Sequence, residues 1–484
     1  MSFPSTTTLV TELRSGRISA AEALAQAIGR IEARDGDINA VVVKDFERAR
    51  AAAAAADAAL ARGDRRPLLG VPMTVKESFN VAGLPTTWGV KDADPTRPLH
   101  DAVTVARLRA SGAVIIGKTN VATYLGDWQS VNAVYGRTRN PWDLARTPGG
   151  SSGGAAAALA AGFVSLELGS DLFGSLRVPA HCCRVFAHRS SHSLLPVRGH
   201  APPGTPELSV AVDIELGVVG PLARCAGDLS LALDVLAGPD DAQGTAYRLA
   251  LPAARHAHLK DFRVLVLEKH PLLPLSSEVG AAIQRYADDL RGAGATVVDT
   301  SPLLPDLTHL AATFNWLLMA LLGAGYPDVT YASRKERAAR LPAEDKSREA
   351  TQARALVSSH RDWFRAQRAR AAISHQWRQL FREWDVVVCP VLPTTAFLHD
   401  DAEMDQRVID VDGQRIPYGL QAIWAGPASL SGLPATAMPI GVGSSGLPVG
   451  VQIIGPYLED RTTIAFAQLA EREFGGFRAP PGFS

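Results

Sequence analysis

A glycine-saturated block constrains this chain more than any other feature of its sequence. The block is Thr147-Pro-Gly-Gly-Ser-Ser-Gly-Gly154, and it runs directly into the alanine-rich residues 155–161. Glycine loses more backbone entropy on folding than any other residue, so four glycines around two serines do not serve helix or strand stability. The block therefore marks a place where the backbone passes close to a reacting group or needs unusual dihedral angles.

Three interpretations of this block compete. A glycine-rich loop before a helix can hold a phosphate group, but this block lacks both the lysine of a Walker loop and the Gly-x-Gly-x-x-Gly spacing. Residues 150–154 match the Gly-x-Ser-x-Gly nucleophile elbow, which also needs a downstream acid and histidine. The third interpretation is a serine hydrolase whose base is lysine, so the distribution of lysine matters.

Lysine is rare in this chain. Lys and Arg together number 49, and eight of them are lysine, at positions 44, 76, 91, 118, 260, 269, 335 and 346. Lys76 ends an apolar run that starts at Gly70, and a second segment contains Asp171, Ser175 and Arg177 in a tight polar turn. A lysine at a strand end, a glycine-flanked serine pair and a second serine turn together favour the lysine-based hydrolase.

With these segments in place, the sequence resembles the amidase signature family of Ser-Ser-Lys amide hydrolases. The resemblance rests on Lys76, on the Gly-Gly-Ser-Ser-Gly-Gly block, on Asp-x-x-Gly-Ser-x-Arg-x-Pro at 171–179, and on Tyr-Gly-Arg-Thr-Arg-Asn-Pro-Trp-Asp at 135–143. Segments at 220–224, 431–434 and 446–455 are also similar to the family. Several motifs in order over nearly the whole chain make the resemblance highly specific.

Transferred residue by residue, the resemblance implies a nucleophile at Ser175, a bridging serine at Ser151 after a cis peptide bond, and a base at Lys76. It also implies an oxyanion hole built from the backbone N–H groups of Leu172, Phe173, Gly174 and Ser175. Supporting or substrate-binding roles fall to Gly150, Ser152, Asp171 and Arg177. The expected partner is a small-molecule amide, without a cofactor, and a homodimer is compatible with this interpretation.

The chemistry of the residue types agrees with these roles. A serine hydroxyl is a weak nucleophile until a neighbouring base accepts its proton, and lysine does so only when burial or neighbouring charges lower its pKa. A serine between the two passes the proton to the base and later returns it to the leaving amine. Arginine cannot replace Lys76 in this role, because a guanidinium does not release its proton near neutral pH.

The chain departs from the family pattern in one patch. Leu172-Phe173 stands where the family usually has Thr-Gly or Ile-Gly, and Arg184, Ala187 and Ser193 occupy glycine positions. A residue with a Cβ in a positive-φ conformation costs on the order of 1 kcal/mol or more. Such a cost could tilt the oxyanion turn, so activity that is weakened, altered or absent stays open at this point.

The same patch contains side chains that can bind metals. These are His181, Cys182, Cys183, His188 and His192. Zinc sites usually show Cys-x-x-Cys or an equivalent paired spacing, and adjacent cysteines chelate one ion poorly. We therefore expect no metal at this patch.

Helix and strand patterns alternate along the chain. Helical patterns occur at 19–31, 51–60, 103–110 and 279–290, and strand patterns at 113–116, 264–267, 296–298 and 386–388. This alternation predicts an α/β sheet covered by helices. The resemblance implies the amidase signature fold, in which a large mixed central sheet has helices on both faces. We expect a single catalytic domain over 1–484, with an N-terminal helical region at about 1–65 packed on it.

Charge and cysteine content exclude several classes of partner. The 49 basic residues balance 49 acidic residues, so the formal charge is zero, without the cationic excess that nucleic acids or anionic membranes require. No apolar run reaches the roughly 20 residues of a membrane span. Four cysteines, two of them adjacent, make a poor disulfide framework in a chain of 484 residues, which favours a cytoplasmic location.

Three functions are compatible with these observations. The first is an amidohydrolase that cleaves a C–N amide bond, with anilides and carbamates among the candidates, through an acyl-serine intermediate. The second is the amidase subunit of a glutamine-dependent amidotransferase, which requires partner subunits. The third is a non-catalytic relative, as the replaced glycines around 173–193 suggest.

Overall fold

A mixed β-sheet forms the centre of the molecule. The computed structural model of the protein describes residues 3–91, 97–205 and 214–483. The strands are β1 (Val41–Lys44), β2 (Pro72–Lys76), β3 (Val114–Thr119), β4 (Val131–Asn132), β5 (Gly136–Arg137), β6 (Leu166–Asp171), β7 (Phe186–Arg189), β8 (Val218–Ala223), β9 (Arg263–Val266), β10 (Thr296–Val298), β11 (Val386–Pro390), β12 (Val408–Val411), β13 (Gln414–Pro417), β14 (Ala435–Val442) and β15 (Pro448–Ile454).

Eleven of these described strands pair in the order β1-β3-β2-β6-β8-β7-β14-β15-β11-β9-β10. The neighbours β3–β2, β2–β6, β11–β9 and β9–β10 are parallel, whereas the remaining neighbours are antiparallel. The predicted large mixed sheet is therefore confirmed. Two short hairpins, β4–β5 and β12–β13, lie outside it.

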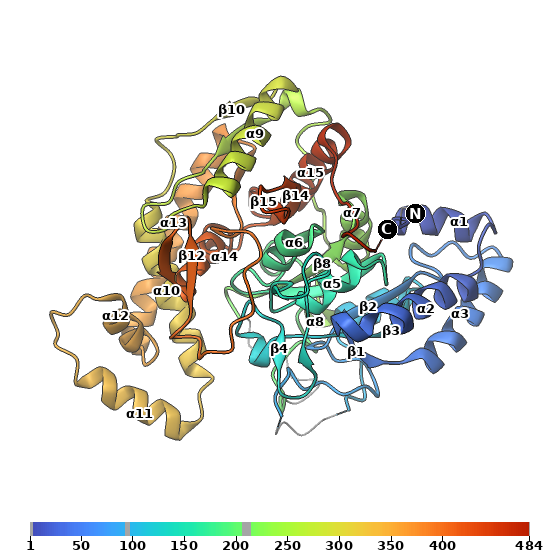
Figure 1. Cartoon of the computed structure of the whole chain (residues 1–484), viewed down its shortest axis with the longest axis horizontal. Coiled ribbons are helices and arrows are strands. Elements are labelled where there is room, and N and C mark those ends of the chain that lie inside the picture. The colour runs from blue at the N-terminus through green and yellow to red at the C-terminus, as the bar shows by residue number, and fades with distance from the viewer. Residues whose placement is uncertain (1–2, 92–96, 206–213, 484) are drawn as a thin grey trace.

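Helices flank the sheet, as predicted (Figure 1). They are α1 (Thr6–Arg14), α2 (Ala20–Ile38), α3 (Phe46–Ala61), α4 (Val103–Ala110), α5 (Gly153–Ala160), α6 (Arg177–Cys183), α7 (Ala226–Leu236), α8 (Asp241–Gly244), α9 (Ser277–Gly292), α10 (Leu307–Ala324), α11 (Asp328–Ala339), α12 (Arg348–Ala355), α13 (His360–Glu383), α14 (Gly426–Ser431) and α15 (Asp460–Phe474). Helices α5 and α6 pack directly on the strands, and α5 is buried along its whole length. A helix that is apolar on all sides suits this central place.

The N-terminal region is mostly helical, and it also contributes a strand. The capping box at Ser19 and Glu22 starts α2: Ser19 Oγ accepts the Glu22 N–H at 3.1 Å, and a Glu22 carboxylate oxygen accepts the Ser19 N–H at 2.8 Å. Strand β1 then pairs with β3 at the edge of the sheet. The end of the chain returns to α2, where Arg34 donates to the Gly482 carbonyl at 2.8 Å.

Helix α10 is long and apolar enough to cross a membrane, by length and composition alone. In the described fold it packs against α12, α13 and α14 and buries Leu310, Phe314 and Leu317. A core helix of a globular protein passes the same test of length and composition. The charged stretch 334–348 is largely exposed; it includes the end of α11 at Ala339 and the loop that follows.

The parallel pairing of β2 and β6 brings the predicted site residues together. Thr74 pairs with Glu167 and Val75 with Leu168, so the carboxyl ends of both strands lie at one edge of the sheet. Lys76 ends β2 and Asp171 ends β6 at this edge. Ligand sites of open α/β sheets often lie at such strand ends.

Candidate active site

Lys76 is fully buried at the end of β2. Its side chain has 0% exposure, and its Nζ donates hydrogen bonds to Ser151 Oγ at 2.8 Å and to Ser170 Oγ at 2.9 Å. Burial lowers the pKa of Lys76 from 10.5 to about 7, although the nearby charge of Asp171 opposes this shift. Near neutral pH a substantial fraction of the amine is therefore uncharged and able to accept a proton.

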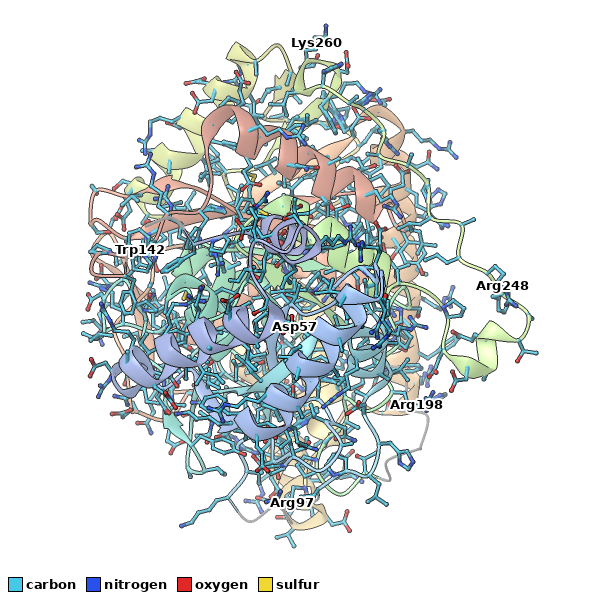
Figure 2. All side chains as sticks on the ribbon, turned by 90° about the vertical axis from the view of Figure 1, so that its right-hand side faces the viewer. Asp57, Arg97, Trp142, Arg198, Arg248 and Lys260 are labelled. Atoms are coloured by element: carbon cyan, nitrogen blue, oxygen red, sulfur yellow. The ribbon has the colours of Figure 1, made fainter. Side chains whose placement is uncertain are left out.

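The other lysines separate into two groups. Lys118 is fully buried like Lys76, whereas the remaining six lysines are exposed. Figure 2 shows Lys260 at the periphery of the molecule, where Arg97 and Arg248 also extend outward. Lysine burial therefore singles out two positions, and only Lys76 contacts the predicted serine of the glycine block.

Steric crowding explains the glycines around Ser151. Gly149 has a φ of +82°, and a Cβ there would lie 2.7 Å from the Pro179 Cα. A Cβ on Gly150 would overlap the Asp127 carbonyl oxygen, and one on Gly154 would overlap the Asn120 backbone nitrogen. The predicted unusual dihedral angle applies at Gly149. The groups that closely approach these three glycines are backbone atoms of other segments, whereas the sequence predicted a reacting group.

Ser151 and Ser152 occupy different environments within the block. The Gly150–Ser151 peptide bond is cis, as the resemblance implies, and Ser151 Oγ contacts Lys76. The Ser152 N–H donates to the Ser175 carbonyl at 3.3 Å, and Ser152 Oγ donates to the Ser170 carbonyl at 3.3 Å. Ser152 therefore joins the glycine block to the turn that carries Ser175, which is a supporting role.

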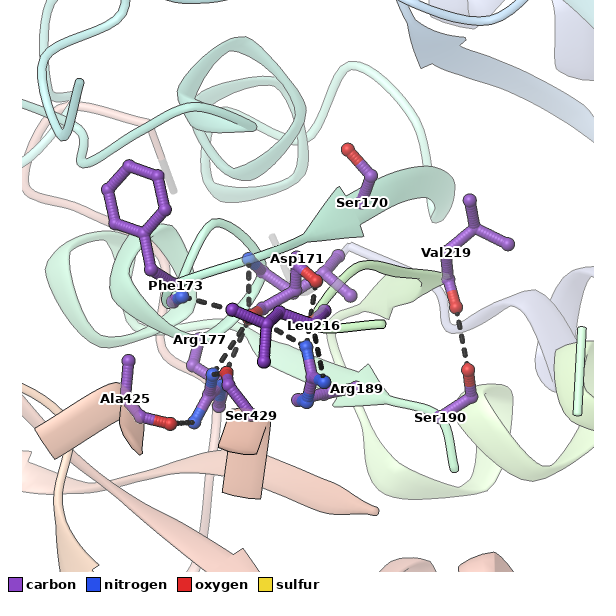
Figure 3. Close-up of polar contacts among 12 residues, drawn as sticks. Ser170, Asp171, Phe173, Arg177, Arg189, Ser190, Leu216, Val219, Ala425 and Ser429 are labelled. Carbon is purple, nitrogen blue, oxygen red and sulfur yellow. Dashed lines mark hydrogen bonds and ion pairs between the residues drawn. The ribbon is translucent and has the colours of Figure 1, made fainter. Parts of the chain in front are cut away.

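The turn between β6 and α6 is organised around the Asp171 carboxylate. That carboxylate accepts the backbone N–H groups of Gly174 at 2.9 Å and Leu176 at 3.1 Å, on either side of Ser175. It also pairs with the guanidinium groups of Arg177 at 2.9 Å and Arg189 at 3.1 Å (Figure 3). Burial alone would raise the pKa of Asp171, but the two guanidiniums and the N–H bonds hold it well below its usual range.

Every N–H group of the Arg177 guanidinium donates a hydrogen bond within or beside this turn. Besides Asp171, it donates to Gln452 Oε1 at 2.6 Å, Ser429 Oγ at 2.9 Å and the Ala425 carbonyl at 3.3 Å. All five N–H donors of the guanidinium are thus engaged within the protein. Of the two roles expected for Arg177, the geometry favours support of the turn over contact with a substrate.

The predicted oxyanion donors are not equivalent. The Gly174 N–H donates to Asp171 and is not directed at a substrate oxygen in this arrangement. The N–H groups of Leu172, Phe173 and Ser175 are therefore the candidates that stay in the proposed oxyanion hole.

The replaced glycines have different consequences. Arg184 and Ser193 do adopt positive φ, at 60° and 65°, whereas Phe173 and Ala187 do not. Arg184 caps the C-terminus of α6, and its guanidinium donates to the Gly476 carbonyl at 3.2 Å. Phe173 packs edge-to-face on Trp128 with ring centroids 5.3 Å apart. The residue nearest Ser175 is therefore unstrained at φ, and the two strained residues lie outside the turn.

A mostly apolar cavity of about 110 Å³ opens beside the serines. Its apolar walls include Trp88, Leu125, Phe173, Val197, Ile214, Val218, Val219 and Leu322, and its polar lining includes Ser151, Ser170, Ser175, His200 and Tyr124. A cavity of about 150 Å³ suffices to hold benzene. The space beside the serines is smaller than that, and it therefore suits a short acyl chain. Helix α10 contributes Leu322 to this wall and buries Phe314 and Leu317 in the core, so the helix serves both the core and the cavity.

The one charged side chain among the described cavity residues is paired with charges of opposite sign. Asp171 is the only side chain among the described lining residues that carries a charge at neutral pH, and two guanidiniums neutralise it. His200 is uncharged there, because burial and the nearby Lys76 lower its pKa to about 3. The described cavity therefore favours an uncharged ligand.

Ser151 and Ser175 line the same cavity. In the described residues no hydrogen bond joins the two hydroxyls, although both line the cavity and Ser151 contacts Lys76. Hydrogen bonds of catalytic groups are often long in the absence of substrate. Ser175 therefore stays the predicted nucleophile.

Sequence reasoning overlooked several residues that complete this site. Ser170 binds Lys76, and Arg189 pairs with Asp171 from β7. The Glu77 carboxylate accepts the Trp88 N–H at 2.9 Å, and Lys118 donates to Thr86 Oγ1 at 2.9 Å in the same loop. The scarcity of lysine is a sequence signal that singles out Lys118. The contacts of Ser170 and Arg189, in contrast, depend on which strands pair, and the sequence does not show this.

The histidines and cysteines of the 181–192 patch serve packing and hydrogen bonding. His181 contacts the carbonyl groups of Gly450 and Thr394, and His188 bonds Asp460 at 2.9 Å. In the part of the chain that the structure describes, no group of three His, Cys, Asp or Glu side chains is arranged to hold a metal ion.

Comparison with known proteins identifies the family. The sequence profile described as Amidase matches residues 22–464, which is most of the chain. The chain belongs to the amidase signature family. The predicted family resemblance is thus confirmed, and the protein is a hydrolase that acts on carbon–nitrogen bonds other than peptide bonds.

Relatives of this amidase include both amidotransferase components and hydrolases. It is 36% identical to the A subunit of the glutamyl-tRNA(Gln) amidotransferase of Anaeromyxobacter sp. (strain K), over 96% of this chain and 95% of that protein. It is 30% identical, with a TM-score of 0.81, to a structure described as an unexpected vestigial protein complex that reveals the evolutionary origins of an s-triazine catabolic enzyme. That match covers 98% of this chain and 100% of the other. A 6-aminohexanoate cyclic dimer hydrolase is 27% identical, with a TM-score of 0.78 and 99% of both chains covered.

Proposed function

We propose that this amidase hydrolyses a small, uncharged amide through Lys76, Ser151 and Ser175, with an acyl-enzyme on Ser175. The observation that carries the proposal is the fully buried Lys76, whose Nζ lies 2.8 Å from Ser151 beside the cavity that Ser175 lines. When the amine is uncharged, its lone pair accepts a proton from Ser151 across the same contact.

The proposed reaction has two stages. Ser175 Oγ attacks the amide carbonyl carbon while its proton moves to Ser151 and the Ser151 proton moves to Lys76. The carbonyl oxygen, now negative, accepts hydrogen bonds from backbone N–H groups of the 172–175 turn, an interaction worth about 3 kcal/mol per donor in comparable sites. The C–N bond breaks as the proton returns to the leaving amine. Water then attacks the acyl-serine carbonyl carbon while its proton moves through Ser151 to Lys76. The bond between the acyl carbon and Ser175 Oγ breaks, the proton returns to Ser175 Oγ, and the acid leaves.

The substrate class follows from the cavity. Its apolar walls and paired charge favour an acyl group without a charge, and its volume of about 110 Å³ favours a short chain. Anilides and carbamates with such groups satisfy both requirements, together with simple amides.

A fluorophosphonate probe tests the mechanism directly. We expect the probe to label Ser175 in the intact protein, and we expect Ser175→Ala to lose both labelling and amide hydrolysis. The exposed serine variant Ser15→Ala is the matched control and keeps both. Absence of labelling at Ser175, or equally fast hydrolysis of a good amide by Ser175→Ala, contradicts the mechanism.

The second candidate is the amidase subunit of a glutamine-dependent amidotransferase. Its support is the Anaeromyxobacter relative, which is named as an amidotransferase component, at 36% identity. Against it, glutamine carries an ammonium and a carboxylate, and the described cavity offers no unpaired charge to either. Hydrolysis of glutamine in preference to neutral amides, together with a co-purifying partner, would favour this candidate over our proposal.

The third candidate, a non-catalytic relative, derives from the positive-φ residues Arg184 and Ser193. A melting temperature that shifts on addition of amides, without any turnover, would favour this candidate.

For the location of the protein we propose the cytoplasm, which the four free cysteines support. A homodimer is compatible with the proposed chemistry.

A further inference from the structure

Strained residues gather at one side of the cavity. Trp88, Tyr124 and Leu125 all line it, and all three are non-glycine residues with positive φ, at 53°, 51° and 59°. This conformation is unfavourable for residues with a Cβ and persists only where the surrounding structure imposes it. Because the three share one cavity wall, the strain points to a function of that wall.

Hydrogen bonds from the residues after Lys76 impose the conformation of Trp88. The Glu77 carboxylate accepts the N–H groups of Thr87 at 2.6 Å and Trp88 at 2.9 Å, and the Trp88 indole donates to the Ser78 carbonyl at 3.0 Å. The Tyr124 N–H then donates to the Trp88 carbonyl at 2.9 Å. The strained wall is thus tied by consecutive bonds to the strand end that carries the base.

The two aromatic rings of this wall occupy different depths. Trp88 is 7% exposed and forms part of the interior, whereas Tyr124 is 62% exposed although it lines the same cavity. Tyr124, which lines the cavity and is exposed to solvent, therefore stands at its mouth. In the proposed reaction the acyl group stays bonded to Ser175 while the amine departs, so the amine needs the open side of the cavity.

We propose that Tyr124 is a specificity-determining residue whose ring contacts the leaving amine, and that N-aryl amides are the preferred substrates. This inference rests on the proposed function and adds the amine half of the substrate to it. An aromatic amine packs on the Tyr124 ring in an offset or edge-to-face arrangement, as aromatic pairs commonly do. A primary amide, whose leaving group is ammonia, gains nothing from this contact.

Two amides with the same acyl group test the inference. We measure kcat/KM for the N-aryl amide and for the primary amide, and take their ratio for each variant. We expect Tyr124→Ala to lower the ratio about fivefold, within the range of one aromatic contact, and Tyr124→Phe to keep it. Tyr247→Ala removes a similarly exposed tyrosine that does not line the cavity, and its ratio stays at the wild-type value.

The outcomes separate this inference from the proposed function. A ratio unchanged in Tyr124→Ala, or lowered equally in Tyr124→Phe, overturns the inference while amide hydrolysis and labelling of Ser175 still support the mechanism. If the wild-type protein hydrolyses neither amide and Ser175 is not labelled, the mechanism and the inference both fail.

Discussion

Lys76 shows how burial changes the chemistry of a single residue. An exposed lysine is protonated at neutral pH, but Lys76 is enclosed at a strand end with two serine hydroxyls as its hydrogen-bond partners. The Asp171 charge, which would favour the ammonium form, is largely compensated by Arg177 and Arg189. The base is therefore kept near its useful pKa by burial and by the pairing of the Asp171 carboxylate.

The pKa of Lys76 predicts the pH dependence of the reaction. Because the amine must be uncharged to accept a proton, kcat/KM should rise with pH through about 7 and be about tenfold lower at pH 6 than on the plateau. Lys76→Arg should lower kcat/KM by about 10²–10⁴-fold at all these pH values, since a guanidinium keeps its proton. Lys44→Arg, an exposed strand position, is the control. Steady-state kinetics from pH 5.5 to 9 checks both, and a flat wild-type profile would contradict the assignment.

The buried ion pairs of Asp171 predict that its replacement strongly destabilises the fold. Asp171→Asn leaves the buried guanidiniums of Arg177 and Arg189 without a counter-charge, so we expect a loss of about 3–5 kcal/mol in the free energy of unfolding. Asp288→Asn breaks an exposed pair with Arg291 and should change that energy by less than about 1 kcal/mol. Denaturant unfolding measures both variants. Equal small effects would show that the Asp171 pairs contribute little.

Elements with strong local signals were predicted well. The helix at 103–110 and the strand at 296–298 match the observed bounds, and the capping box at Ser19 starts α2 as expected. Short strands with weaker signals were not found. Strand β1 lies inside the region expected to be helical, and β7 carries a histidine and an arginine at buried positions. Both strands depend on neighbours far away in the sequence, which periodicity cannot show.

The glycine block predicts a contrast between two glycine-to-alanine variants. Gly154→Ala places a Cβ against the backbone of Asn120, so we expect it to destabilise the protein by about 1–3 kcal/mol. Gly29 lies within α2, where an added Cβ would meet no atom within 4 Å, and Gly29→Ala should stabilise by about 0.5–1 kcal/mol. Thermal unfolding of the two variants compares them directly. A neutral Gly154→Ala would remove the steric explanation of the block.

At the scale of the whole molecule, the buried carboxyl of Glu167 links stability to pH. Burial raises its pKa from 4.5 to about 8, so between these values the folded state holds a proton that the unfolded state has released. Its contribution to stability therefore falls as pH rises through this range. We expect the stability of Glu167→Gln relative to wild type to increase from pH 5 to pH 8. Exposed Glu32→Gln is the control, and a difference that is constant with pH would contradict the linkage.

The sequence alone determined which reactive residues this amidase contains and which local backbone conformations they require. It showed a scarce lysine after an apolar strand, serines among glycines, and ordered motifs that identified the family, because steric needs and strand or helix periodicity are local properties. The tertiary structure decided which parts meet. Strand pairing placed Ser170 beside Lys76 and Arg189 beside Asp171, and distant segments enclosed the cavity. Burial and long-range contacts set pKa values and pocket shape, and neither is encoded in residue spacing.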